Sequence, residues 1–380
     1  MIKPHSSICN LNCQYCYYLS KKRLYPNSNY RMNDKTLEEF IKQYLEAQKT
    51  PVVSFGWQGG EPALMGIDFF EKVIHYQKKY NKEGKKVENT FQTNGTLLNE
   101  DWGRFFKKHN FLIGISIDGP PKMHDVYRVD RKGTPTFNKV KLGLDILKKY
   151  EVEYNILTCV HSVNVNHPLE VYKYLRDELQ VNFIQFIPVV ERNIDGRVSD
   201  FSTTGSQYGT FLQTVFDEWV RHDVGMIFIQ IFEVALAAWL NLPLNLCTFA
   251  PNCGNALALE YNGDIYACDH FVTPEYFRGN LLSQSLKEIV NSLDQKEFGL
   301  KKSRLLPQEC QQCEVRFVCN GGCPKNRFIS TEERNSGLNY LCEGYKTFFS
   351  YIDPYMKYMA DQLKRNRPAT NIMEYLKEKS

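Results

Sequence analysis

The stretch CNLNCQYC, residues 9–16, places Cys9, Cys13 and Cys16 within eight positions near the start of a 380-residue chain. Four thiolates close an iron–sulfur cluster, whereas three leave one iron with an open position for a further ligand. The motif therefore favours a metal centre that performs chemistry. The spacing also fits a structural zinc site that borrows a fourth ligand such as His5.

The residues that follow predict a parallel α/β fold, either a barrel or an open sheet. Up to about residue 190, β-rich runs alternate with amphipathic stretches about thirty residues apart, as in βα units. The expected strands are a short piece before Cys9, Val52–Trp57, Thr90–Gln92 with its flanks, Phe111–Ile117, Tyr154–Val160 and Phe183–Pro188. Two apolar faces predict helices: Leu37, Phe40, Ile41, Tyr44 and Leu45, and Phe137, Val140, Leu144 and Leu147. Asn33 or Asp34 is expected to cap the first.

The second half of the chain has a different pattern. Residues 200–244 predict two helices without a strand between them, and residues 247–342 predict short irregular segments that hold eight of the twelve cysteines. Further helices are expected at Tyr355–Leu363 and at Met373–Lys377. The predicted domains are residues 1–200, a helical connection 201–246, a cysteine-rich domain 247–345, and a C-terminal helix and tail 346–380.

Composition limits the classes of function. The net charge of +4 comes from 47 basic and 43 acidic residues, so neither nucleic acid nor a membrane is an expected partner. The longest apolar run, Gly225–Leu244, is interrupted by polar residues, and no signal peptide is recognisable, which predicts a cytoplasmic protein. Twelve cysteines in a reducing compartment indicate metal ligation.

With Tyr15 before its last cysteine, the C-x3-C-x2-C motif resembles the signature of the radical S-adenosylmethionine (SAM) superfamily. The resemblance implies a partial (β/α)6 barrel and a [4Fe-4S] cluster on Cys9, Cys13 and Cys16. In that family the open iron chelates SAM, and reductive cleavage gives a 5′-deoxyadenosyl radical that abstracts hydrogen.

The same resemblance implies a set of SAM-binding residues: Tyr15, Gly59, Gly60, Glu61, Ser116, Arg128 and Val190. The sequence GGEP, residues 59–62, is similar to the family motif that holds the methionine amino group, while Ser116 should meet the ribose and Arg128 the carboxylate. Residues 92–95, QTNG, end another expected strand, at the same carboxyl-terminal edge of the sheet where the other SAM-binding residues are expected. Without the family, these features are equally compatible with a turn, a strand-end cap and a surface arginine.

The remaining cysteines resemble the SPASM extension of that superfamily. The resemblance implies two auxiliary [4Fe-4S] clusters, one on Cys247, Cys253, Cys268 and Cys323 and the other on Cys310, Cys313, Cys319 and Cys342. The chain would then carry three clusters, with Cys159 left as a buried thiol. CxxC pairs serve zinc equally well, so two zinc knuckles are the alternative.

Along almost its whole length the chain looks like the anaerobic sulfatase-maturating enzymes. Resembling segments are Ile2-Lys3-Pro4, residues 58–62, residues 92–95, Tyr154–Leu157 and Leu338–Cys342. The resemblance implies oxidation of a cysteine or serine in a Cys/Ser-x-Pro-x-Arg motif to Cα-formylglycine. Asp269 aligns with the catalytic base, and an auxiliary cluster accepts the electron after hydrogen abstraction from Cβ. Tyr18 matches a tyrosine that lines the family's site.

The implied partners are a nascent or unfolded sulfatase polypeptide and a flavodoxin- or ferredoxin-type electron donor. Because Asp269 follows Cys268 directly, we expect an anionic cluster to raise its pKa. Two other functions fit the motifs: a SPASM enzyme that forms a thioether or carbon–carbon crosslink, and a non-catalytic electron carrier or zinc-binding interaction module.

Overall fold

The computed structural model describes residues 1–330 and 337–379. The chain forms two compact units. Unit 1 comprises Met1–Ile117, His124–Asn155 and Gly254–Gly299, and unit 2 comprises Asp118–Met123, Ile156–Cys253 and Leu300–Ser380. These units divide the chain in space, and the domain boundaries given above remain a prediction.

Unit 1 is built on strands in the order β10-β9-β8-β1-β2-β3-β4. The strands β1 to β4 run parallel, β1 also runs parallel to β8, and β8, β9 and β10 are antiparallel. Their bounds are β1 Ile2–Lys3, β2 Val52–Trp57, β3 Lys86–Thr93, β4 Phe111–Ser116, β8 Ala258–Glu260, β9 Asp264–Tyr266 and β10 Phe277–Asn280. The short first strand and the α/β class are as predicted.

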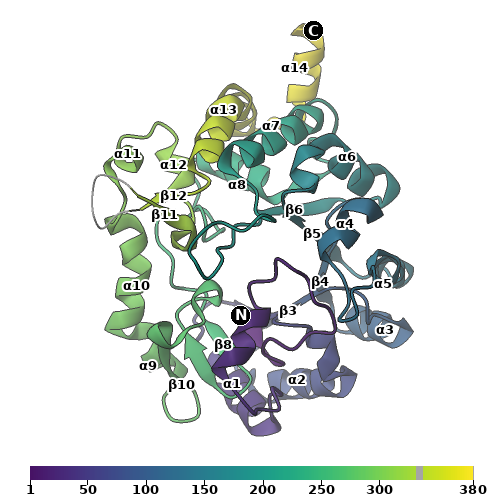
Figure 1. The fold of residues 1–380 in the computed structure, drawn as a ribbon, viewed down its shortest axis with the longest axis vertical. Helices are drawn as coiled ribbons and strands as arrows, with labels where there is room; N and C mark the ends of the chain where they lie inside the picture. The colour runs from purple at the N-terminus through teal and green to yellow at the C-terminus, as the bar shows by residue number, and fades with distance from the viewer. Residues whose placement is uncertain (331–336, 380) are drawn as a thin grey trace. The chain divides into compact units, whose positions relative to one another are not determined.

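Helices cover the strands of unit 1 on their outer side (Figure 1). They are α1 Asp34–Ala47, α2 Ile67–Tyr80, α3 Glu100–Lys108 and α5 Phe137–Lys149, and α9 Leu286–Asn291 packs beside α1. Asn33 caps α1 by accepting a hydrogen bond from the Thr36 amide at 2.9 Å. The core between these layers is aromatic, with Phe55, Phe70 and Phe91 fully buried.

Unit 2 holds three parallel strands and a helical layer. Residues 156–160 of β5 (Tyr154–Val160) pair with β6 (Phe183–Pro188), which pairs with β7 (Phe228–Ile229). The main helices are α6 Pro168–Lys173, α7 Gly205–His222, α8 Gln230–Trp239, α13 Cys342–Lys364 and α14 Asn371–Lys379.

Two expectations for unit 2 are wrong. A strand, β7, does lie between α7 and α8, but its two residues are too few for a period to be recognised. The helix expected at Tyr355–Leu363 is the second half of a longer helix, α13, that begins at Cys342. The prediction was too short because a proline such as Pro354 usually marks a helix boundary in a sequence.

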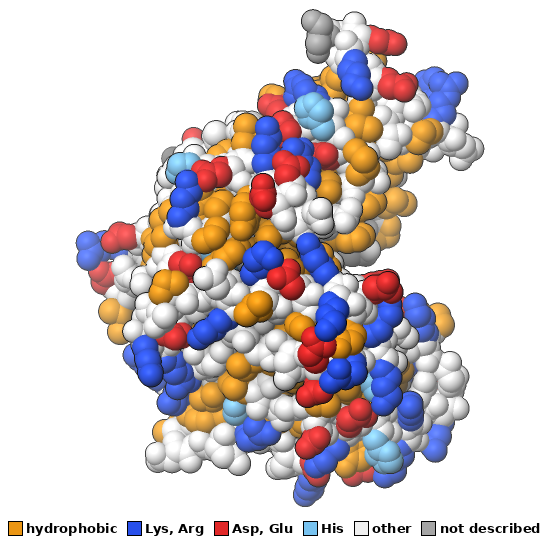
Figure 2. All heavy atoms as spheres, turned by 90° about the vertical axis from the view of Figure 1, so that its right-hand side faces the viewer, with side chains coloured by type: hydrophobic (Ala, Val, Ile, Leu, Met, Phe, Trp, Pro, Cys, Tyr) orange, Lys and Arg blue, Asp and Glu red, His pale blue; other side chains and the backbone are white. Residues whose placement is uncertain are grey.

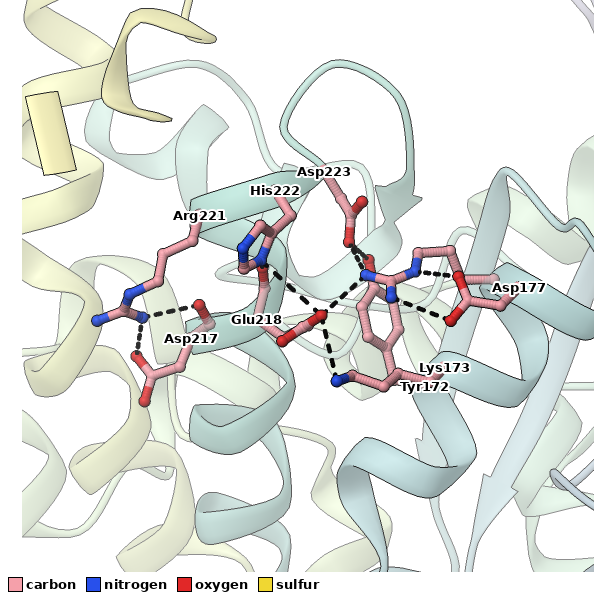
Figure 3. A network of polar contacts seen from close by, with 9 residues as sticks. Tyr172, Lys173, Asp177, Asp217, Glu218, Arg221, His222 and Asp223 are labelled. Carbon is pink, nitrogen blue, oxygen red and sulfur yellow. Dashed lines mark hydrogen bonds and ion pairs between the residues drawn. The ribbon is translucent and has the colours of Figure 1, made fainter. Parts of the chain in front are cut away.

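Polar contacts fix α6 and the turn after it to α7 (Figure 3). Tyr172 donates to the Asp223 carboxylate at 2.6 Å, and Arg176 donates to Asp223 at 2.8 Å and to Glu218 at 3.1 Å. Because Tyr172 is fully buried and Asp223 nearly so, this network compensates the desolvation of the carboxylate.

The surface carries mixed charge. On the face drawn in Figure 2, Lys and Arg side chains are interspersed with Asp and Glu, consistent with the near balance of 47 basic and 43 acidic residues. Among the residues that the structure describes, no helix is both long and apolar enough to cross a membrane.

Candidate active site

The three-cysteine loop follows β1 in unit 1 and is fixed to residues 127–131. The Asn12 amide donates to the Val129 carbonyl at 2.8 Å, and the Arg131 Nε donates to the Cys9 carbonyl at 2.9 Å. The Asn94 side chain donates to the Cys9 sulfur at 3.5 Å. These hydrogen bonds from neighbouring segments hold the cysteine loop in place.

The thiols of this loop fit a metal centre. Burial, then the nearby Glu61 carboxylate, raises the pKa of Cys9 to about 12, and burial raises the pKa of Cys16. Cys9 and Cys16 also act on each other electrostatically. Buried thiols that resist ionisation become thiolates when a cationic metal group compensates their charge.

Glycines after β2 bring a second loop against the cysteine loop. The Gly60 amide donates to the Ser6 carbonyl at 2.7 Å, and the Glu61 amide donates to the Ile8 carbonyl at 2.8 Å. A Cβ on Gly60 would lie 2.0 Å from the Ile8 carbonyl oxygen. Only glycine allows this approach of two backbones.

We therefore expect Gly60→Ala to disrupt the cysteine loop, with loss of most iron bound there and of SAM binding. The measurement is iron content and binding of SAM on anaerobic protein. Gly56→Ala is the control, because a Cβ at Gly56 on β2 meets only the Thr90 hydroxyl at 3.6 Å. Parental iron and SAM binding in the Gly60 variant would contradict the role of this contact.

Glu61 is completely buried, and its carboxylate is held within the protein. It accepts hydrogen bonds from the Ala63 amide at 2.9 Å, the Thr93 hydroxyl at 2.9 Å and the Asn94 amide at 2.8 Å. Burial raises its pKa to about 7 against these hydrogen bonds, which lower it. Glu61 thus joins the GGEP loop to the end of β3, where residues 92–95 lie.

The other expected SAM contacts divide between the units. In unit 1, the Arg128 guanidinium lies 5.4 Å from the centroid of the Tyr15 ring, and both residues are buried. Ser116 ends β4 and accepts a hydrogen bond from Gln92 at 3.2 Å. Val190 is buried in unit 2. The structure brings Tyr15, Arg128, Glu61 and Ser116 into the unit that holds the cysteine loop, and their contact with SAM remains a prediction.

Asp269 is 6% exposed at the start of a 3-10 turn, Asp269–Phe271, in unit 1. One carboxylate oxygen forms an ion pair with the Lys3 ammonium, and the other accepts a hydrogen bond from the Tyr17 hydroxyl at 2.5 Å. The upward shift expected from an anionic cluster at Cys268 remains a prediction, and the protein groups around Asp269 act in the opposite direction. Burial raises the pKa of Asp269, but Lys3, His270 and Tyr17 outweigh burial and lower it to about 2. Asp269 is therefore a carboxylate at neutral pH.

Tyr17 and Lys3 are site residues to which sequence reasoning assigned no role. Tyr18, named instead, donates to the buried Glu260 carboxylate and packs beneath the Lys3 ammonium, 4.2 Å from its ring centroid. The sequence did hold one indication of the role of Lys3, namely a lysine within the short strand expected before Cys9. A buried cation needs an anionic partner. Which carboxylate it meets depends on the pairing of β1 with β8.

The cysteines of unit 2 form two groups. Cys310, Cys313, Cys319 and Cys342 act on one another electrostatically, and burial raises the pKa of Cys319 to about 12 and that of Cys342 to about 11. Four thiols are the number that a closed metal site requires, and a site on these four remains a prediction.

The second group consists of Cys247, Cys253 and Cys323, because Cys247 acts electrostatically on Cys253 and on Cys323. Burial is the main cause of the raised pKa of Cys253 and of Cys323. Cys268, the fourth predicted ligand, belongs to unit 1. The ligand sets remain predictions, since among the described residues no three potential ligands already form a metal-binding group.

Comparisons with known proteins match the segments that hold the cysteine loop and five of the later cysteines. A model of the radical SAM superfamily matches residues 3–175, and a model of an iron–sulfur cluster-binding domain, SPASM, matches residues 247–314. The chain is 44% identical over its whole length to the serine-type anaerobic sulfatase-maturating enzyme of Bacteroides thetaiotaomicron, covering 95% of that protein. It is 36% identical to the cysteine-type enzyme of Clostridium perfringens, covering 96% of this chain and 98% of that protein. It also resembles the solved structure of native anSMEcpe with bound AdoMet and Cp18Cys peptide, with a TM-score of 0.86, 35% identity, and coverage of 95% and 98% of the two chains.

Proposed function

The chain belongs to the anaerobic sulfatase-maturating enzymes of the radical SAM superfamily, and from this we propose that it oxidises a cysteine or serine in a Cys/Ser-x-Pro-x-Arg motif to Cα-formylglycine. The observation that carries the proposal is similarity over the full chain, with the cysteine loop and Asp269 located in one compact unit. The substrate is a sulfatase polypeptide, and the electron donor is a flavodoxin- or ferredoxin-type protein.

The residues of the chain fit three [4Fe-4S] clusters and SAM. Cys9, Cys13 and Cys16 hold the cluster with the open iron, and the eight cysteines of the SPASM region hold two closed ones. When bound, these groups supply the hydrogen-abstracting radical and accept the electron that the substrate loses.

Asp269 acts as the proton acceptor for the substrate thiol or hydroxyl. Its low pKa keeps it in the carboxylate form, which is the form that accepts a proton. Lys3 holds one oxygen and Tyr17 the other. Because a carboxylate offers about four lone-pair positions, both oxygens can accept a further hydrogen bond. Lys3 and Tyr17 therefore orient the base rather than replace it.

The test is anaerobic incubation with two peptides that differ only in Cys or Ser at the reacting position of Cys/Ser-x-Pro-x-Arg, followed by mass spectrometry. The serine peptide should lose two hydrogen atoms, and the cysteine peptide should exchange its CH2SH group for CHO. A hydrazine reagent traps the aldehyde. A peptide with alanine at that position is the control.

A product that loses two hydrogens but traps no hydrazine would indicate a crosslink instead and would contradict the proposal. Lack of any product together with normal SAM cleavage would exclude this peptide motif as the substrate.

A further inference from the structure

Two cationic side chains lie among the cysteine-bearing loops of unit 2. Lys302, on α10 (Leu293–Arg304), is 1% exposed, and its Nζ donates to the carbonyl oxygens of Cys247 at 2.6 Å, of Thr248 at 2.8 Å and of Ala250. A lysine ammonium has three N–H donors, so three carbonyls satisfy it completely. Because residues 247–250 form no helix or strand, Lys302 supplies partners for carbonyls that regular structure leaves unpaired.

Arg327, at the start of β11 (Arg327–Ile329), extends this arrangement to the other loop. Its guanidinium donates to the Lys302 carbonyl at 2.6 Å and to the carbonyls of residues 320–322 at 2.9 to 3.3 Å. Those three residues lie between Cys319 and Cys323. The two cations thus connect residues 247–250, which include a ligand of one predicted cluster, with residues 319–323, which carry ligands of both predicted clusters.

Burial lowers the pKa of Lys302 to about 8, and Arg327 lowers it as well. Cys253, Cys323 and Cys247 act on this pKa in the opposite direction. Burial also lowers the pKa of Arg327, against cysteines of both groups. A buried cation without an opposite charge is costly, since neither water nor an ion pair compensates it. Ligated thiolates would supply that opposite charge.

We propose that Lys302, supported by Arg327, is the counter-charge of the auxiliary cluster to which Cys247, Cys253 and Cys323 are predicted ligands, and that it raises the reduction potential of that cluster. The inference rests on the proposed function, in which the substrate radical gives up one electron and the cluster gains it. Gaining an electron makes an anionic cluster more negative, and a nearby cation stabilises the reduced form more than the oxidised form. Lys302 is a positioning and tuning residue and does not touch the substrate.

The experiment uses the full-length chain with Cys9, Cys13 and Cys16 replaced by alanine, so that only auxiliary clusters contribute. In this background, Lys302→Met removes the charge but keeps the apolar stem, and a redox titration followed by electron paramagnetic resonance gives the potential of each cluster. We expect one cluster to shift its reduction equilibrium at least tenfold towards the oxidised form, which is about 59 mV for a one-electron couple. Lys301→Met is the matched control, because Lys301 is the exposed neighbour on the same helix.

Lys302→Gln is the second neutral variant, and its amide can still donate to two of the three carbonyls. Unchanged potentials in a neutral variant with full iron would overturn the proposal. Selective loss of one cluster, with the iron-free protein as stable as its parent, would support Lys302 as the holder of that ligand loop. If both neutral variants unfold without iron, Lys302 is a structural ion and the tuning role is wrong. The titration needs neither SAM nor peptide, so a negative result here is distinct from failure to form formylglycine.

Discussion

Replacing Cys9, Cys13 and Cys16 together by alanine is expected to abolish 5′-deoxyadenosine formation and to lower the iron content from about 12 to about 8 atoms per chain, as loss of one [4Fe-4S] cluster requires. The reason is that Cys9, Cys13 and Cys16 are the predicted ligands of the cluster whose open iron would bind SAM. Peptide oxidation should vanish with it. Iron analysis and chromatography of deoxyadenosine on one anaerobic preparation make the measurement.

Cys159→Ala is the matched control for this experiment. Cys159 lies on β5 in unit 2, where it is half-buried rather than buried as predicted, and it belongs to none of the three predicted ligand sets. Its replacement should leave iron, deoxyadenosine and product at parental levels. Deoxyadenosine formation that survives the triple replacement would show that the radical site lies elsewhere.

Replacing Asp269 by asparagine should lower formylglycine formation by orders of magnitude while iron and SAM binding persist. The amide keeps the shape of the side chain but cannot take the substrate proton, and each tenfold loss of rate represents about 1.4 kcal/mol of barrier. The variant also leaves the Lys3 ammonium without its ion pair in a buried position. Deoxyadenosine should continue to form slowly without an equal amount of aldehyde.

Glu275→Gln serves as the control for Asp269→Asn, since it neutralises an exposed carboxylate a few residues away. Iron, deoxyadenosine and aldehyde should be measured together. Near-parental aldehyde with full iron would remove Asp269 from the mechanism. If the variant loses iron and aldehyde together, Asp269 serves to support the loop that carries Cys268.

Local pattern was sufficient for most of the parallel strands. Tyr154–Val160 and Phe183–Pro188 have the predicted bounds, because short β-branched and aromatic runs between polar turns have few other solutions. The first half of α13 was missed because helix packing tolerates Pro354, which propensity alone disfavours. The helix α10 was missed because cysteine spacing suggested irregular chain around it, and its apolar face is weak.

The site divides in the same way. The cysteine motif and the GGEP loop lie in short contiguous stretches, so the sequence indicated both. The contacts of Asp269 could not be predicted, since Tyr17 is 252 positions away and meets it only through the pairing of distant segments. The lowering of the Asp269 pKa by Lys3 could not be predicted for the same reason: the adjacent Cys268 is visible in the sequence, whereas the contact with the Lys3 ammonium is not.

The place of β1 between β2 and β8 has a consequence for biosynthesis. The Leu259 amide donates to the Met1 carbonyl at 2.9 Å, and Lys3 lies opposite Glu260 in the strand register. The strand β1 therefore has one neighbour, β2, that is close in sequence and another, β8, that is far away. At about 5–20 residues per second, translation completes β8 roughly 10 to 50 s after β1. Until then β1 keeps one open edge, and Lys3 has no Asp269 to pair with. The cysteine loop is therefore synthesised first, but the contacts of β1 with β8 and of Lys3 with Asp269 form late. Insertion of iron and sulfide should follow synthesis of the cysteine-rich half of the chain.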